Sequence, residues 1–280
     1  MPFFERAGQP RLHYELDDYT DPWKHAPYII LQHGYARSAR FWRPFVPYLS
    51  RFYKVIRPDL RGLGQSDKNF DLERGITIEA YMNDLVALLD HLGIESAHYC
   101  GESSAGALGM AYAATHPKRV RTLSLISAPV FMTEEDKKSS LGGYPDRVTA
   151  LRALGSRGWL EASNAGRRFP ADTDPRLLAW TLDEMGKSDT EVLVAMFKCV
   201  SEVNCTDLLP KIQAPVLGLY PQQGVIVTDE HTELLREKVR DVRIVRIPSK
   251  AHSLQVVQPA TCALEVLHFI AQHDGVACHE

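Results

Sequence analysis

The chain has 280 residues, of which 45% are hydrophobic and 24% charged, and its formal net charge at pH 7 is −3. This composition is that of a globular protein and excludes a disordered chain, and the mixed charges predict neither a nucleic-acid partner nor an anionic membrane partner. The length suits one large α/β domain or a core with an inserted lobe.

The cysteines, the histidines and the first residues predict a cytoplasmic protein without a cofactor. Five cysteines without a CxxC pair indicate reduced thiols. The start, MPFFERAGQPRLHYELDD, lacks a basic segment followed by an apolar stretch, so we expect no signal peptide. No window approaches 18 uncharged apolar residues, so no membrane span is expected. The eleven histidines lack metal-ligand spacing, and no metal site is predicted.

In the first hundred residues, short strand patterns alternate with helical ones. Residues 11–16 alternate as an edge strand does, and the apolar run 27–32 suits a strand buried on both faces. A helical pattern interrupted by prolines spans 41–49, and 53–57 is the next strand candidate. Residues 77–91 predict the clearest helix, with a glycine shortly after its end.

The stretch from His98 to His116 predicts a strand, a very tight turn and a helix. Gly101 and Ala105 flank Ser103 two positions on either side, which is the spacing of a nucleophile elbow with Ala in place of its last Gly. Small side chains are needed there because strand and helix approach closely around a strained residue. The backbone N–H of Ser104 would then face a developing oxyanion.

The remaining elements predict a mostly parallel, doubly wound sheet with an insertion. Strands are expected at 120–126, 214–220 and 242–247, and helices at 230–239 and 259–273. Residues 132–204 are charged and helix-rich without a strong strand. We therefore expect residues 1–131 and 205–280 to form the core, and 132–204 to form a helical cap over the carboxyl ends of the strands.

Four motifs in this order resemble the α/β-hydrolase superfamily over nearly the whole chain. They are His33-Gly34-Tyr35, the segment 59–66 (DLRGLGQS), the turn around Ser103, and Ala251-His252 before the last helix. Within the superfamily the chain looks most like the capped serine esterases and lactonases, a group that includes 3-oxoadipate enol-lactonases. The resemblance implies an α/β-hydrolase fold with an inserted lid.

Each motif has a chemical interpretation. Ser103 is the candidate nucleophile and needs a base, and His252, in the loop after the last strand, is that candidate base. The backbone N–H of Tyr35 and that of Ser104 are the expected oxyanion donors. His33 is expected to pack beneath the oxyanion loop as a structural residue, and the 59–66 segment to be a structural loop.

The expected acid of a Ser–His–Asp/Glu triad is missing. Its usual position, after the strand 214–220, falls on Gly224, and the alternative position, after the strand 120–126, falls near Ser127. Glu102 resembles the glutamate of cholinesterase-like Gly-Glu-Ser turns and is one candidate. Asp229 or Glu230 is another if the loop folds back, although both suit the cap of a helix. The third alternative is a Ser–His pair held by Ser127 or a backbone carbonyl.

The predicted activity is serine-dependent hydrolysis of an ester or lactone in a small molecule, without a cofactor, by a monomer or homodimer. Aromatic cap residues are candidates for the pocket, namely Trp159, Phe169 and Trp180, with Met196 and Phe197 beside them. One rival is C–C bond hydrolysis of a β-diketone or ring-fission product. The other is a ligand-binding or degenerate hydrolase, suggested by the vacancy at position 224.

Overall fold

A computed structural model describes residues 2–134, 137, 143–164, 168–224 and 226–278. The strands are β1 (Phe3–Phe4), β2 (Leu12–Asp17), β3 (Tyr28–Gln32), β4 (Lys54–Pro58), β5 (Ala97–Glu102), β6 (Val120–Ile126), β7 (Val216–Pro221) and β8 (Val242–Ile247). The α-helices are α1 (Val46–Leu49), α2 (Leu72–Gly75), α3 (Ile78–His91), α4 (Ser104–Thr115), α6 (Arg147–Asn164), α7 (Pro175–Gly186), α8 (Thr190–Glu202), α9 (Asp229–Lys238), α10 (Leu254–Val257) and α11 (Pro259–Asp274). The described residues also form the 3₁₀ helices η1 (Ala39–Phe45), η2 (Pro117–Arg119) and η3 (Leu209–Lys211). In the described part of the chain, no helix is both long and apolar enough to cross a membrane.

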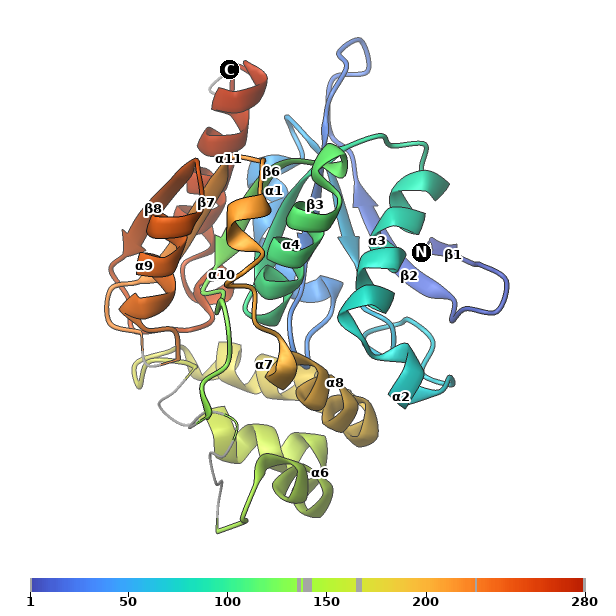
Figure 1. Cartoon of the computed structure of the whole chain (residues 1–280), viewed down its shortest axis with the longest axis vertical. Helices are drawn as coiled ribbons and strands as arrows, with labels where there is room; N and C mark the ends of the chain where they lie inside the picture. The colour runs from blue at the N-terminus through green and yellow to red at the C-terminus, as the bar shows by residue number, and fades with distance from the viewer. Residues whose placement is uncertain (1, 135–136, 138–142, 165–167, 225, 279–280) are drawn as a thin grey trace.

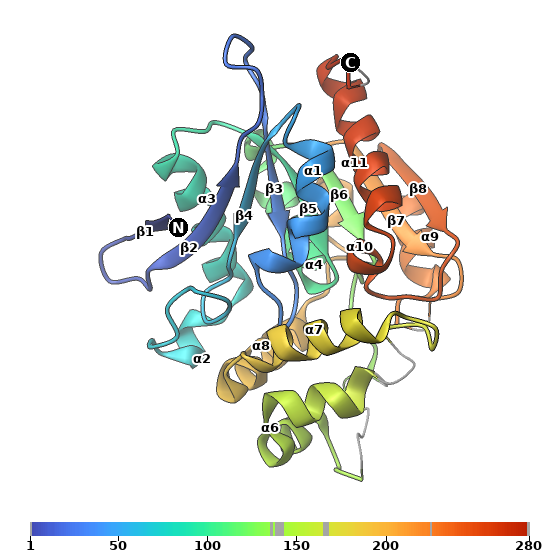
Figure 2. The same cartoon turned by 180° about the vertical axis from the view of Figure 1, so that it is seen from behind.

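The strands form one eight-stranded sheet in the order β1-β2-β4-β3-β5-β6-β7-β8. β2 runs antiparallel to β1 and β4, and all other neighbours are parallel. Helices α3, α4 and α9 cover one face (Figure 1), and α1 and α11 cover the other (Figure 2). The predicted doubly wound, mostly parallel sheet is therefore confirmed.

The central strand β3 is largely apolar because helices bury both of its faces. In β3, Ile30 belongs to the core layer beneath α3 and α4, whereas Ile29 and Leu31 belong to the layer beneath α1 and α11. Successive side chains of a strand point to opposite faces, so a continuous apolar run fills both layers. β5 lies between β3 and β6, with Gly101 opposite Gln32 and Leu125. The turn after β5 is thereby placed at the middle of the sheet.

Two predicted elements differ from the structure. The strand expected at the edge, β2, is covered on its outer side by the two-residue β1, because Phe3 and Phe4 pair with it. The helix expected over 41–49 is instead the 3₁₀ helix η1, which contains Pro44, followed by the short α1. Proline lacks the backbone N–H that an α-helix interior requires.

Helices α6, α7 and α8 are inserted between β6 and β7 and lie together beyond one end of the sheet (Figures 1 and 2). An isolated antiparallel bridge joins Phe131, the residue before the segment predicted to be the cap, to Asn204, the last residue of that segment. Parts of that segment, residues 135–136, 138–142 and 165–167, lie outside the described residues. The inserted helices lie beyond the end of the sheet at which β5 turns into α4 (Figure 2).

Candidate active site

Ser103 occupies the turn between β5 and α4 with φ 54° and ψ −124°. A non-glycine residue in such a conformation is strained by about 1–3 kcal/mol. Its neighbours are small because the turn leaves no room: a Cβ on Gly101 would lie 2.5 Å from the Ala105 carbonyl oxygen. A Cβ on Gly106 would overlap Ala128. The turn thus holds Ser103 at the N-terminal end of α4, where it lines the main pocket.

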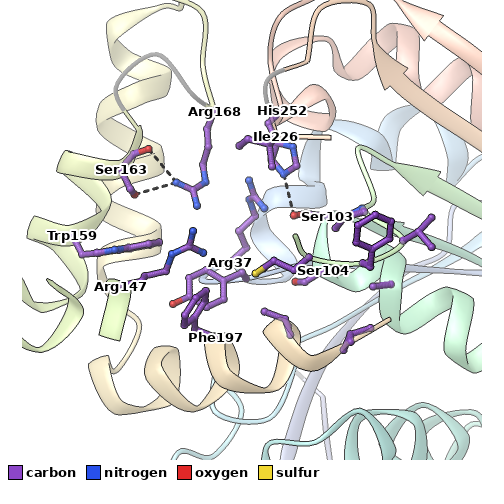
Figure 3. A pocket seen from close by; sticks show the side chains of 18 residues that line it. Arg37, Ser103, Ser104, Arg147, Trp159, Ser163, Arg168, Phe197, Ile226 and His252 are labelled. Atoms are coloured by element: carbon purple, nitrogen blue, oxygen red, sulfur yellow. Dashed lines mark hydrogen bonds between the residues drawn. The ribbon is translucent and has the colours of Figure 1, made fainter. Parts of the chain in front are cut away.

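His252 lies in the loop between β8 and α10 and lines the same pocket as Ser103. Its Nε2 is 3.0 Å from the Ser103 Oγ (Figure 3). The backbone N–H groups of His252 and Ser253 donate to the Arg168 carbonyl oxygen, at 3.1 and 3.3 Å. The histidine loop is therefore tied to the inserted segment. A serine hydroxyl and an imidazole at this distance have the geometry that a nucleophile–base pair requires.

Glu102, the residue before Ser103, is fully buried and forms an ion pair with Arg37. The Arg37 Nη1 donates to the Glu102 Oε2 at 2.5 Å, and its Nη2 donates to the Ser253 Oγ at 2.7 Å. Burial raises the pKa of the Glu102 carboxyl, while the Arg37 charge opposes that rise. Nothing in the HGYAR segment indicates that the Arg37 side chain turns inward, so this contact was not predicted from the sequence.

The contact between Glu102 and His252 involves the histidine nitrogen that also faces Ser103. The Glu102 Oε1 is 3.9 Å from the His252 Nε2. A triad acid instead hydrogen-bonds to Nδ1–H and selects the tautomer. Glu102 is therefore placed to stabilise a positive imidazolium electrostatically, and this contact does not orient the ring through Nδ1.

Replacing Arg37 tests how strongly the ion pair stabilises the fold. Arg37→Met is expected to lower the free energy of unfolding by about 3–5 kcal/mol, because it leaves a buried carboxylate without its partner. Urea denaturation at pH 7 measures this change, and exposed Arg43 offers a control, since Arg43→Met should stay within about 0.5 kcal/mol. A double variant with Glu102→Gln should lose less than the sum of the single variants, and strict additivity would contradict the coupling.

The other candidate acids do not approach His252. The Asp229 carboxylate pairs with Arg246, and its side chain is 77% exposed. Glu230 is also exposed, in the first turn of α9, where an acidic side chain favours the helix dipole. The alternative in which either residue folds back onto His252 is therefore wrong. Ser127 is buried with φ 48°, and its Oγ finds no hydrogen-bond partner among the described residues.

Gly224, at the usual acid position, is tightly enclosed. A Cβ there would lie 2.7 Å from the Pro221 Cγ and 3.2 Å from the Val227 carbonyl oxygen. We expect Gly224→Asp to lower the free energy of unfolding by about 1–3 kcal/mol through overpacking and not to raise kcat. Thermal unfolding and ester turnover measure both effects. Gly224→Ala separates the steric cost from the charge, and a tenfold gain in kcat specific to the Asp variant would contradict this expectation.

The loop after β3 approaches the Ser103 turn closely at Gly34. A Cβ on Gly34 would lie 2.7 Å from the Glu102 carbonyl oxygen and 3.2 Å from the Ser104 Oγ. Among the described residues, the backbone N–H groups of Tyr35 and Ser104 have no hydrogen-bond acceptor. Two such donors beside the Ser103 hydroxyl suit an oxyanion hole. The Tyr35 hydroxyl donates to the Leu193 carbonyl oxygen of α8 at 3.0 Å, and burial raises its pKa.

His33 and Asp59 support this loop from below. The His33 Nδ1 is 3.0 Å from the Gly34 carbonyl oxygen, and its Nε2 accepts a hydrogen bond from the Leu60 N–H. The Asp59 carboxylate accepts hydrogen bonds from the Ala39 and Gln65 N–H groups. Both side chains are buried. They are structural residues, as the sequence predicted.

The pocket above Ser103 lies between the sheet and the inserted helices. Trp159, one predicted pocket residue, lines it together with Phe197. Phe169 and Trp180, predicted alongside Trp159, are not among the described lining residues: Phe169 is in the core, and Trp180 packs on Phe41. The lining that sequence analysis did not anticipate includes Arg37, Arg147, Ser163, Arg168 and Ile226. Helix periodicity alone does not distinguish a side that faces a pocket from one that faces a core.

The described residues contain no group of three His, Cys, Asp or Glu side chains placed to hold a metal ion. The five cysteines are present as free thiols. Burial raises the pKa of Cys205 to about 12, and Cys100 is also fully buried.

Known proteins resemble this chain over most of its length. It is 24% identical over 273 residues to the putative carbamate hydrolase RutD of Stutzerimonas stutzeri, covering 94% of this chain and 98% of that protein. It is 25% identical over 242 residues to the strigolactone esterase D14 of Arabidopsis thaliana, covering 84% and 89%. The enol-lactonase structure from Burkholderia xenovorans superposes with a TM-score of 0.86 at 24% identity, covering 96% of this chain and all of that one. At 24% identity, the superposition shows a common fold and nothing about function.

A family model extends these pairwise similarities. The model of the alpha/beta hydrolase fold matches residues 27–259. The matched range runs from the start of β3 to the start of α11 and contains the Ser103 turn, the inserted helices and His252. The resemblance drawn from the four sequence motifs is thereby confirmed, and the chain belongs to the α/β-hydrolase fold family.

Proposed function

We propose that this protein is a serine hydrolase that cleaves an ester or lactone bond of a small organic molecule through an acyl-enzyme. The observation that carries the proposal is the 3.0 Å contact between the Ser103 Oγ and the His252 Nε2 at a strained turn. The esterase and the carbamate hydrolase among its relatives are proteins named for hydrolysis of carbonyl compounds, which supports the same class.

The first half of the reaction forms the acyl-enzyme. The Ser103 oxygen attacks the substrate carbonyl carbon while its proton passes to the His252 Nε2. The carbonyl oxygen becomes an oxyanion that accepts hydrogen bonds from the Tyr35 and Ser104 N–H groups. The imidazolium then protonates the leaving alkoxide, the carbon–oxygen bond breaks, and the acyl group stays on Ser103. In a lactone the alkoxide remains part of the same molecule.

The second half releases the acid. His252 removes a proton from water, the resulting hydroxide attacks the acyl carbonyl, and the tetrahedral intermediate collapses to a carboxylic acid and free Ser103. An imidazolium forms in both halves, and Glu102 lies 3.9 Å from the nitrogen that carries its new proton. At an effective dielectric constant of 20, two opposite unit charges at that distance attract by about 4 kcal/mol. The neighbouring Arg37 offsets part of this attraction.

A fluorophosphonate probe and a panel of substrates test the proposal. The probe is expected to label wild-type protein and to leave Ser103→Ala unlabelled, because only an activated serine reacts. 4-Nitrophenyl acetate, γ-butyrolactone and a β-diketone then distinguish ester, lactone and C–C cleavage. Labelling without turnover of any of them would favour the ligand-binding alternative. Absence of labelling would contradict a serine mechanism.

A further inference from the structure

We propose that the inserted helix α8 positions one of the two oxyanion donors, because the Tyr35 hydroxyl fixes that residue's backbone N–H by bonding to the Leu193 carbonyl oxygen. The inference rests on the proposed function and adds a positioning group to it, the Tyr35 side chain. Its evidence is the contact itself, the strained loop that the contact holds, and the docking of α8 onto the core.

The Tyr35 side chain is fixed at two points by the inserted segment. Its hydroxyl donates to the Leu193 carbonyl oxygen, in the first turn of α8, at 3.0 Å. Its ring meets the buried Trp159 ring of α6 edge to face, with 5.7 Å between the centroids and 72° between the planes. A tyrosine side chain has only two χ angles, so these two contacts restrict the backbone to which the ring is attached.

The Tyr35 hydroxyl is suited to a permanent role as a donor. Burial raises the pKa of Tyr35, so the phenol keeps its proton at the pH values at which an imidazole acts as a base. A carbonyl oxygen has two lone pairs, so the Leu193 oxygen can accept this bond and still accept the helical bond from four residues further on. The contact therefore holds Tyr35 without opening α8.

The loop after β3, which carries the Tyr35 N–H, needs support from outside. Ala36, the next residue, has φ 58°, a conformation that a non-glycine residue keeps only where its surroundings hold it. On the other side of Tyr35, a Cβ on Gly34 would lie 2.7 Å from the Glu102 carbonyl oxygen, so the loop is pressed against the Ser103 turn. A displacement of the loop therefore moves the donor away from the reacting carbonyl, and a misplacement of 1 Å can cost about 10²-fold in rate.

Helix α8 is anchored on the core beside this contact. A Cβ on Gly62 would lie 2.8 Å from the Val192 Cγ1, and Val192 is 1% exposed, so α8 packs on the 59–66 loop at that residue. The Asp189 carboxylate accepts two backbone N–H groups of the first turn and caps the helix there. The Leu193 carbonyl oxygen is therefore held at a fixed position relative to the sheet.

Replacing the carbonyl oxygen of a substrate by sulfur tests the inference. Sulfur is a weak hydrogen-bond acceptor, so the oxyanion donors determine the ratio of kcat/KM for 4-nitrophenyl acetate to kcat/KM for its thionoester analogue. Tyr35→Phe removes the hydroxyl and keeps the ring. We expect it to lower kcat for the acetate, and this oxo-to-thiono ratio, on the order of 10-fold with KM unchanged, since a displaced donor costs less than a deleted one.

Tyr220→Phe is the matched control. Tyr220 is also buried, and its hydroxyl donates to the Ala128 carbonyl oxygen at 2.9 Å, but it is not among the described residues that line the pocket. Its variant loses a hydrogen bond of the same kind, so its Tm should fall about as much as that of Tyr35→Phe, while its kcat and its ratio stay at the wild-type values. An unchanged ratio in Tyr35→Phe, or an equal fall in both Phe variants, would overturn the inference.

Val192→Ala distinguishes a donor held by α8 from a hydroxyl that contacts the substrate directly. Loosening α8 at Val192 should lower the ratio in the wild-type background and have no further effect in Tyr35→Phe, where the hydroxyl no longer joins the loop to α8. Additive effects, or no effect of Val192→Ala in either background, would overturn the role of α8. Should Tyr35→Phe fail to fold, Val192→Ala alone decides by the same ratio.

The outcomes separate this inference from the function beneath it. Turnover of the acetate with an unchanged ratio in Tyr35→Phe would overturn the role of α8 and leave the hydrolase proposal standing. A wild-type protein that cleaves neither ester and is not labelled by the fluorophosphonate would contradict the hydrolase proposal, and the inference would fall with it.

Discussion

Ser103→Ala is expected to lower kcat for ester hydrolysis by about 10⁴-fold or more, because the covalent route disappears and only binding and the oxyanion donors remain. The protein should stay folded, since the substitution keeps the Cβ and removes one hydroxyl. Steady-state turnover of 4-nitrophenyl acetate, with thermal unfolding of the same samples, measures both effects.

Ser124→Ala is the matched control for this variant. Ser124 is also a buried serine, and its Oγ has no hydrogen-bond partner among the described residues. It lies in β6 and is not among the described residues that line the pocket, so its variant should turn over at the wild-type rate. If Ser103→Ala kept more than about a tenth of wild-type kcat, Ser103 would not be the nucleophile.

Glu102→Gln is expected to lower kcat by about 10²-fold with little change in KM. The imidazolium that Glu102 faces exists only as the reaction proceeds, so removing the charge affects the transition state more than substrate binding. Neutralising an acid at Nδ1 costs about 10⁴-fold. We expect less here, because the contact is to Nε2 at 3.9 Å and Arg37 offsets part of the field. Full kinetics at several substrate concentrations separate kcat from KM.

Two controls accompany Glu102→Gln. Glu184→Gln removes a largely buried carboxylate that pairs with Arg40 and Lys187 outside the pocket, and it should leave kcat unchanged. Asp229→Asn removes an exposed carboxylate in the first turn of α9 and should cost about 1 kcal/mol of stability at most. Near wild-type turnover in Glu102→Gln would show that the imidazolium needs no help from this carboxylate.

The order of most strands and helices, and the tight turn that holds Ser103, followed from the sequence alone. Apolar runs such as 27–32 are determined by burial on both faces, a property that each strand carries in its own residues. The turn at Ser103 was recognisable for a similar reason, since the small residues that it requires lie within two or three positions of it. A structural requirement that neighbouring residues meet by themselves can be recognised from a short stretch of sequence.

The electrostatic environment of the site was decided only by the tertiary structure. Arg37 contacts Glu102, which is 65 residues away in the sequence, and Ser253, which is 216 residues away. Arg147 and Arg168 reach the pocket from the inserted segment. No local pattern marks such contacts, because a charged side chain on a loop or helix looks the same in sequence whether it faces solvent or a cavity. The search for the triad acid likewise depended partly on the sequence and partly on the tertiary structure. The absence of a carboxylate at position 224 was visible in the sequence, whereas the contact of Glu102 with the His252 Nε2 depends on how the end of β5 packs against a loop distant in the sequence.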